Sequence, residues 1–190
     1  MIDEKLEAGN DVESIADVAT IRDRNRELAV AIQKALLERG EMMATAESLT
    51  GGLVASHIVD IAGSSSVFAG GIVAYQNEIK EKLLGVPHQI LEENGAVSAE
   101  TVKAMAENAR KTFGCQWAIA TSGIAGPTGA EPGKPVGTVW IAVANSLQNE
   151  AFCKIFAGNR TEVREKSVYS ALGKLLFLLN NQKSTCTSEH

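Results

Sequence analysis

Ala46-Glu47-Ser48-Leu49-Thr50-Gly51-Gly52 joins a short segment that resembles a strand, residues 42–46, to an apolar run that continues to about Ile61. We expect that run to be a helix starting near Thr50, with Thr50 as its N-cap. Gly51 and Gly52 would then be the first helical residues and would leave backbone N–H groups open to a ligand. The stretch therefore predicts a strand, a tight turn and a helix in succession.

Ser48 is the candidate nucleophile in this turn. Free N–H groups and the helix dipole would favour negative charge beside it, such as a developing oxyanion. On these residues alone, an ordinary glycine turn that leads into a core helix is slightly the better interpretation.

Strand-like and helix-like segments alternate through the rest of the chain. Helices are expected over 21–39 (closed by Gly40), 78–84 (capped by Asn77), 89–93, from Ser98 to about Phe113 and from Thr161 onward; strands are expected over 67–75, 117–121, 136–145 and 150–156. The last two strands are close enough for a hairpin through 146–149. This order predicts one α/β domain with three layers, α/β/α, and a mixed, mostly parallel sheet.

The composition and charge of the chain exclude several classes of protein. The chain has 190 residues and a formal net charge of −5, and its Lys and Arg residues do not cluster with aromatics, so we expect no nucleic-acid partner. No apolar run is long enough to cross a bilayer, so we expect no membrane partner. Three widely spaced cysteines indicate a reduced, cytoplasmic protein, and the lack of metal-ligand spacing predicts no metal and no cofactor. Residues 1–20 are interpreted as a polar extension, 21–180 as the domain and 181–190 as a frayed tail.

Lys80 is the candidate base. If Asn77 caps the helix, Lys80 lies in its first turn, where the helix dipole and partial burial would both lower its pKa. An amine with a lowered pKa can accept the proton of a serine. The alternative is a solvated lysine, which is how Lys82 is interpreted.

Two further segments are candidates for ligand binding. The residues from Thr121 to Gly129 follow a predicted buried strand, at the end of a sheet where ligands of α/β proteins collect. Arg160 and Arg164 flank a predicted helix start and could bind phosphate or carboxylate, unless they only pair with Glu162 and Glu165. His57 is expected to pack or to lie on a helix face, and Ser64-Ser65-Ser66 is too short a match to a Ser-Ser-Lys amidase to carry weight.

Taken together, these segments resemble the CinA C-terminal domain family, the nicotinamide-nucleotide amidases. The resemblance runs from about Arg26 to Leu179, and its matching segments are Thr45–Gly52, Gly63–Ser65, Tyr75–Lys80, Leu84–Val86, Gly95–Ser98, Thr121–Pro127 and Lys134–Val139. Leu49 stands where the family usually has cysteine. Asn159 stands where a Gly-Asp-Arg motif is common, and this departure removes a partner expected to orient Arg160. The family often carries a second domain, and this chain is expected to be the stand-alone form.

The resemblance implies hydrolysis of nicotinamide mononucleotide to nicotinic acid mononucleotide and ammonia, without a metal. By position, Ser48 would be the nucleophile, Lys80 its base, and Tyr75 a residue that orients the amide or relays the proton. Backbone N–H groups near Thr50 and Gly51 would bind the oxyanion. The remaining implied contacts would hold the nucleotide: Thr121, Ser122, Gly123 and Gly126 in the loop, and Arg160 or Arg164 on the phosphate.

Three functions remain open on the sequence. The first is this amidase. The second is a catalytically silent, nucleotide-binding or regulatory paralogue of the same family, and the third is a hydrolase of another small carboxamide. A homo-oligomer, with a two-fold dimer favoured, is expected for a compact α/β enzyme of this size.

Overall fold

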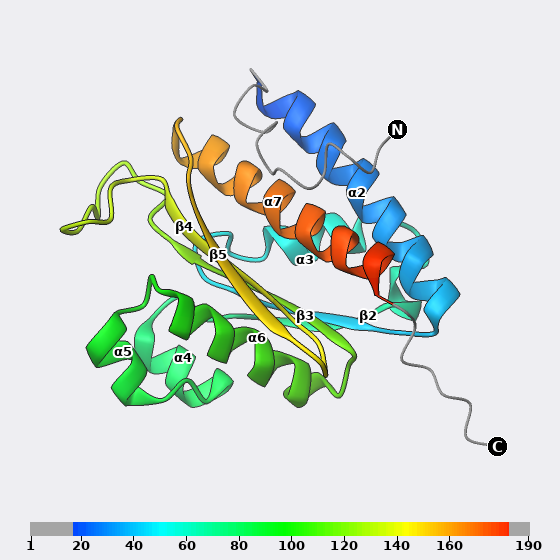
Figure 1. Cartoon of the computed structure of the whole chain (residues 1–190). Coiled ribbons are helices and arrows are strands. Elements are labelled where there is room, and N and C mark those ends of the chain that lie inside the picture. Colours follow the sequence, from blue (N-terminus) through cyan, green and yellow to red (C-terminus); the bar gives the residue numbers. More distant parts are fainter. Residues whose placement is uncertain (1–16, 183–190) are drawn as a thin grey trace.

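The computed structural model describes residues 17–182 (Figure 1). The expected extension and frayed tail lie mostly outside these residues, although Val18 to Thr20 already belong to the first described helix. The elements are, in chain order, α2 (Val18–Arg39), β1 (Met43–Glu47), α3 (Leu53–Val59), η2 (Ser64–Ser66), β2 (Phe68–Val73), α4 (Asn77–Leu84), α5 (His88–Asn94), α6 (Ala99–Phe113), β3 (Trp117–Gly123), β4 (Thr138–Ala144), β5 (Asn149–Ile155) and α7 (Arg160–Asn181).

Five strands form one sheet in the order β2-β1-β3-β4-β5. β1 pairs in parallel with both β2 and β3, whereas β4 is antiparallel to β3 and to β5. Four strands therefore run in one direction, and β4 alone runs in the other. The predicted mixed, mostly parallel sheet is confirmed, as is the hairpin between β4 and β5.

Helices cover both faces of the sheet, so the predicted three layers are confirmed (Figure 1). α2, α3 and α7 pack on one face through a large aliphatic cluster that includes Ile32, Leu36 and Leu172. α4, α5 and α6 cover the other face, where alanines of the sheet meet Val102 and Met105 of α6. The small alanine side chains let α6 lie close to the strands, and close packing of this kind supplies most of the stability of a small domain.

The helix caps were predicted with mixed success. Ser98 caps α6 and the left-handed Gly40 closes α2, as predicted. Asn77 is instead the first residue of α4, after Gln76. The cap of α7 is Asn159, whose side chain accepts from Thr161 and Glu162 in a capping box, and not Thr161 itself. Each error is a shift of one or two residues at a helix end, where several polar side chains compete for the same N–H groups.

The four segments singled out in the sequence meet at one edge of the sheet. Ser48 follows β1, Tyr75 follows β2, residues 123–126 follow β3 and Arg160 follows β5, and these four strands run in the same direction. Carboxyl ends of such strands form the usual ligand site of an open α/β sheet. Ser64–Ser66 precede β2 and so lie at the opposite edge.

Candidate active site

The hydroxyl of Ser48 lies next to the amine of Lys80 at this edge. The distance from Lys80 Nζ to Ser48 Oγ is 3.3 Å, and Nζ also donates to the carbonyl oxygens of Ala74 at 2.9 Å and Tyr75 at 3.3 Å. The Lys80 residue is only 1% exposed, and Ser48 is 8% exposed. The structure thus brings the predicted nucleophile and base within hydrogen-bonding distance.

The chemical state of Lys80 follows from its surroundings. All three hydrogen-bond partners are uncharged, and no carboxylate within residues 17–182 forms an ion pair with the ammonium group. Burial therefore lowers the pKa of Lys80 from its ordinary 10.5 to about 8. An amine with this pKa is partly neutral near physiological pH and can accept a proton from a serine hydroxyl.

The turn after Ser48 differs from the sequence prediction. α3 begins only at Leu53, after Gly51 and Gly52, which both have left-handed backbone conformations. The Thr50 side chain does not cap this helix, because its Oγ1 is buried 2.7 Å from Oγ1 of Thr121. Glycine is the residue that accepts two successive positive φ angles at low cost, which explains the glycine pair.

Glu47 occupies the N-terminus of α3. Its carboxylate accepts hydrogen bonds from the backbone N–H groups of Gly52, Val54 and Ala55, at 2.8 to 3.1 Å. These groups were expected to be open to a ligand, and that expectation is wrong because a carboxylate already satisfies them. An acidic residue a few positions before a helix start is a sequence signal that could have found this cap.

Two backbone donors beside Ser48 are unengaged. Gly51 N–H, one of the expected oxyanion donors, is 3.1 Å from the carbonyl oxygen of Ser48 and is therefore already satisfied. The N–H groups of Leu49 and Thr50 have no hydrogen-bond partner within residues 17–182. They are the donors left to stabilise an oxyanion on a group attacked by Ser48.

Arg160 and Tyr75 meet across the mouth of the site. Arg160 Nη2 donates to the Tyr75 hydroxyl at 3.0 Å, and Nη1 donates to the carbonyl oxygen of Gly126 at 3.0 Å. Asn159 turns its side chain to the helix N-terminus, and Arg160 finds these other partners. The Tyr75 hydroxyl forms no hydrogen bond to Ser48 or Lys80, so its suggested role as a proton relay stays a prediction.

Arg164 points to the nucleophile turn. Its Nε donates to the carbonyl oxygen of Leu49 at 3.0 Å and its Nη2 to that of Thr50 at 2.6 Å. Neither Glu162 nor Glu165 forms an ion pair with it, so the simple surface pairing considered for it is wrong. Arg164 is only partly exposed, whereas Arg160 is exposed at the mouth of the site, which makes Arg164 the poorer phosphate ligand of the two.

The residues expected in the binding loop are mostly internal, and three of them, Thr121, Ser122 and Gly123, belong to β3, which is longer than predicted. Thr121 is fully buried against Thr50, and its carbonyl oxygen accepts from the N–H of Ser48 at 2.9 Å. Ser122 is 1% exposed and donates to the carbonyl oxygen of Ala96 at 2.7 Å. Gly123 lies at the end of β3, and buried Gly126 anchors Arg160. These four residues support the site, and their expected contact with a nucleotide stays a prediction.

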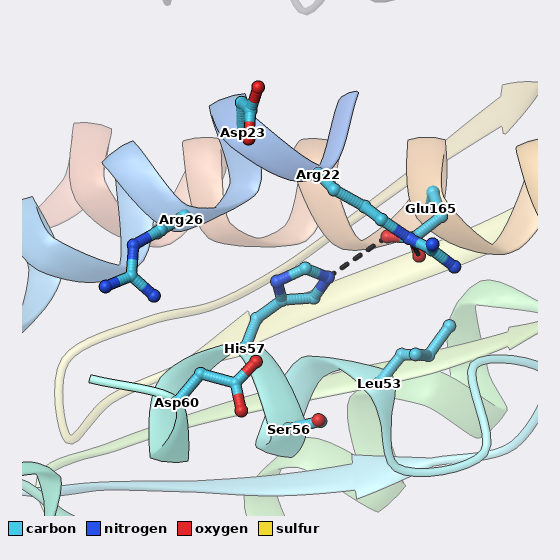
Figure 2. Close-up of a pocket in the computed structure, with 8 residues that line it drawn as sticks. All are labelled: Arg22, Asp23, Arg26, Leu53, Ser56, His57, Asp60 and Glu165. Atoms are coloured by element: carbon cyan, nitrogen blue, oxygen red, sulfur yellow. Dashed lines mark hydrogen bonds and ion pairs between the residues drawn. The ribbon is translucent and has the colours of Figure 1, made fainter. Parts of the chain in front are cut away.

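A separate hollow lies on the other side of α3 (Figure 2). It measures about 360 Å³ and is lined by residues of α2 and α3 together with Glu165 of α7, and by none of the predicted site residues. The Glu165 carboxylate accepts from Arg22 at 2.6 Å and Asn25 at 3.1 Å, and lies 3.0 Å from His57 Nε2. Burial raises the pKa of Glu165, but His57 and Arg22 outweigh it and lower the pKa to about 2. His57 thus contacts a neighbouring helix, and no local pattern in the sequence points to this partner.

Two negative findings apply to the described part of the chain. No cluster of His, Cys, Asp or Glu suited to a metal ion occurs in residues 17–182. Across the same range, none of the helices has the length and apolar character that crossing a bilayer requires.

Known proteins are similar to this chain in both sequence and fold. The family model described as CinA C-terminal domain matches residues 25–179. A CinA-like protein of Anaeromyxobacter dehalogenans is 45% identical over 153 residues, which cover 80% of this chain and 38% of that protein. A CinA-like protein of Geobacter sulfurreducens is 44% identical over 160 residues, which cover 84% of this chain and 38% of that protein. The chain thus spans well under half the length of these relatives.

Solved structures match over nearly their whole length. The competence damage-inducible protein A of Klebsiella pneumoniae has a TM-score of 0.81 and 36% identity, with 84% of this chain and 99% of that chain covered. The competence/damage inducible protein CihA of Agrobacterium tumefaciens has a TM-score of 0.80 and 39% identity, with 83% and 96% covered.

Proposed function

The chain belongs to the CinA C-terminal domain family, and on that premise we propose that it is an amidohydrolase that acts through Ser48 and Lys80. The proposed substrate is nicotinamide mononucleotide, and the products are nicotinic acid mononucleotide and ammonia. The observation that carries the proposal is the 3.3 Å contact between Lys80 Nζ and Ser48 Oγ, made by a buried amine whose pKa is lowered to about 8.

Acylation would use the neutral form of Lys80. The amine takes the proton of Ser48, and Oγ attacks the carboxamide carbon, so that the carbonyl oxygen becomes an oxyanion. The N–H groups of Leu49 and Thr50 would stabilise this charge. When the C–N bond breaks, Lys80 returns the proton to the departing nitrogen, and ammonia leaves an acyl-Ser48 intermediate.

Deacylation would repeat the sequence with water. Neutral Lys80 takes a proton from a water molecule, the resulting hydroxide attacks the acyl carbon, and the ester bond to Ser48 breaks. The proton then returns to Ser48 Oγ, which regenerates the free enzyme and releases the carboxylic acid, which ionises by losing its proton to the solvent. The balance of the reaction requires only the amide and water.

Arg160 is the proposed phosphate ligand. It is exposed at the mouth of the site, and its hydrogen bonds to Gly126 and Tyr75 leave three of the five guanidinium N–H donors for a ligand. Planar guanidinium groups suit the oxygens of a phosphate monoester. The bonds to Tyr75 and Gly126 would hold the guanidinium in place before substrate arrives.

The test is ammonia release from nicotinamide mononucleotide by the wild type and three variants. We expect Ser48→Ala and Lys80→Met to lose the activity, and Lys82→Met, an exposed lysine on the same helix, to keep it. Activity that survives in Ser48→Ala would overturn the assignment of the nucleophile. Binding of the nucleotide without release of ammonia by the wild type would instead identify a silent nucleotide-binding protein.

Nicotinamide and nicotinamide riboside serve as competing substrates in the same assay. Turnover that depends on the 5′-phosphate would support the mononucleotide as substrate. Equal turnover of all three carboxamides would leave the amidase chemistry in place and overturn the choice of substrate.

A further inference from the structure

We propose that Arg164 is a positioning residue that holds the oxyanion-binding peptide of this site; the proposal rests on the amidase function above. The side chain contacts neither Ser48 Oγ nor Lys80 Nζ. It acts on the backbone of the two residues that follow the nucleophile.

The argument starts from the geometry of a peptide unit. In a trans peptide the C=O and N–H bonds point in opposite directions. The only cis peptide bond within residues 17–182 joins Gly126 to Pro127, so the units that follow Ser48 are trans. A donor that binds one carbonyl oxygen therefore fixes the direction of the N–H group of the next residue.

Arg164 fixes the direction of one unengaged donor. Its Nε binds the carbonyl oxygen of Leu49 at 3.0 Å, and this carbonyl shares a peptide unit with the N–H of Thr50. The Thr50 N–H must therefore point away from the guanidinium. Thr50 is fully buried and this N–H has no partner among the described residues, although buried backbone donors are nearly always paired. A donor of this kind, two residues after the nucleophile, is suited to donate a hydrogen bond to a transient oxyanion.

The neighbouring donor is held by the turn itself. Gly51 N–H binds the carbonyl oxygen of Ser48 at 3.1 Å, and this carbonyl shares a peptide unit with the N–H of Leu49. Arg164 also contributes here, because its Nη2 donates to the carbonyl oxygen of Thr50 at 2.6 Å. This carbonyl belongs to the peptide unit that carries the Gly51 N–H. One guanidinium thus binds two successive peptide units, and a single lysine ammonium cannot bind both with the same rigidity.

Glu165, the next residue of α7, fixes the position of Arg164. Glu165 binds Arg22 and Asn25 of α2 and contacts His57 of α3, so it ties α7 to the helix that follows the nucleophile turn (Figure 2). Two consecutive residues of α7 therefore contact the turn after Ser48 and the helix α3 that follows it: Arg164 binds the turn, and Glu165 contacts α3. Arg164 also forms no ion pair with a carboxylate within residues 17–182, so its charge would add to the stabilisation of an oxyanion.

The experiment separates a positioning role from phosphate binding. Steady-state kinetics of the wild type, Arg164→Gln and Arg164→Lys are measured with nicotinamide mononucleotide and with nicotinamide riboside, which carries the same carboxamide without the phosphate. We expect Arg164→Gln to lower kcat by about 10- to 100-fold with little change in KM, and by the same factor for both substrates. Arg164→Lys, which can bind one carbonyl oxygen, should retain an intermediate kcat. An unchanged kcat with a raised KM for the phosphorylated substrate alone would overturn the proposal.

A second measurement does not depend on the natural substrate. A fluorophosphonate probe forms a covalent bond to an activated serine and places a developing oxyanion in the same position as an amide does. Its rate of addition to Ser48 is followed by intact mass, with Ser48→Ala as the unlabelled control. Slower labelling of Arg164→Gln than of wild type supports the proposal even if no ammonia is released from any carboxamide. Equal rates overturn it and leave the amidase proposal standing, and absence of labelling in the wild type overturns both.

Discussion

Lys80 Nζ and Ser48 Oγ lie 3.3 Å apart, although the two residues are 32 positions apart in the sequence. Ser48 follows β1, and Lys80 lies on α4, shortly after the neighbouring parallel strand β2. Their contact thus depends on the register of two parallel strands, which end at the same edge of the sheet. The rate of reaction at Ser48 should therefore depend on the protonation state of Lys80.

The first prediction concerns the pH dependence of amide hydrolysis. Only neutral Lys80 can accept the Ser48 proton, and burial lowers its pKa to about 8. We expect kcat/KM for nicotinamide mononucleotide to rise with pH and to level off above an apparent pKa near 8. A profile that is flat between pH 6.5 and 9.5 would contradict the assignment of Lys80 as the base.

The second prediction concerns stability. Lys80 has a lower pKa in the folded chain, about 8, than its ordinary value of 10.5, so the unfolded state binds more protons between these limits. Stability contributed at this position therefore rises with pH across this window. Relative to Lys80→Met, the wild type should gain about 3 kcal/mol between pH 7.5 and 10.5. Urea unfolding of both proteins at several pH values measures the difference, in which all other titrating groups cancel, and a difference independent of pH would contradict it.

The third prediction concerns Glu165. Its pKa is lowered to about 2, from an ordinary 4.5, by His57 and Arg22 against the effect of burial. The carboxylate therefore stabilises the fold above about pH 4.5 and loses this contribution as the pH falls toward 2. Glu165→Gln should cost about 2–3 kcal/mol of unfolding free energy at pH 7. Chemical unfolding at pH 7 and at pH 3 should show a smaller cost at the lower pH, and an equal cost at both would contradict the ion-pair explanation.

The fourth prediction concerns Glu47. Its carboxylate accepts from three N–H groups at the start of α3, and no other described side chain serves them. We expect Glu47→Ala to lower the free energy of unfolding by about 1–3 kcal/mol, because these donors lose a charged acceptor. Since the same donors frame the turn after Ser48, kcat should fall as well. Glu78→Ala, an exposed acidic residue at the start of α4, is the control and should change stability by less than about 0.5 kcal/mol.

The sequence allowed the fold to be predicted from its periodicity, because amphipathic helices such as α6 and apolar strands such as β3 each have a clear period. The meeting of Ser48 and Lys80 was inferred from a family resemblance, and strand order alone explains it physically. The partners of Glu47, Arg164 and Glu165 were missed. Glu47 had a local signal, because an acidic residue stands shortly before a helix start. Arg164 and Glu165 instead bond groups that are distant in the sequence, whose positions are set by tertiary packing, and local sequence carries no record of that packing.

The last prediction separates two roles of Tyr75. Its hydroxyl accepts from Arg160 at 3.0 Å, whereas its backbone carbonyl oxygen accepts from Lys80 at 3.3 Å. Tyr75→Phe removes the hydroxyl and keeps the carbonyl, so we expect a raised KM for nicotinamide mononucleotide and a kcat within about threefold of wild type. A relay of the catalytic proton would require a loss of kcat of about 100-fold or more. Arg160→Gln should raise the same KM, and in the double variant the two effects should not add, because both changes break one contact.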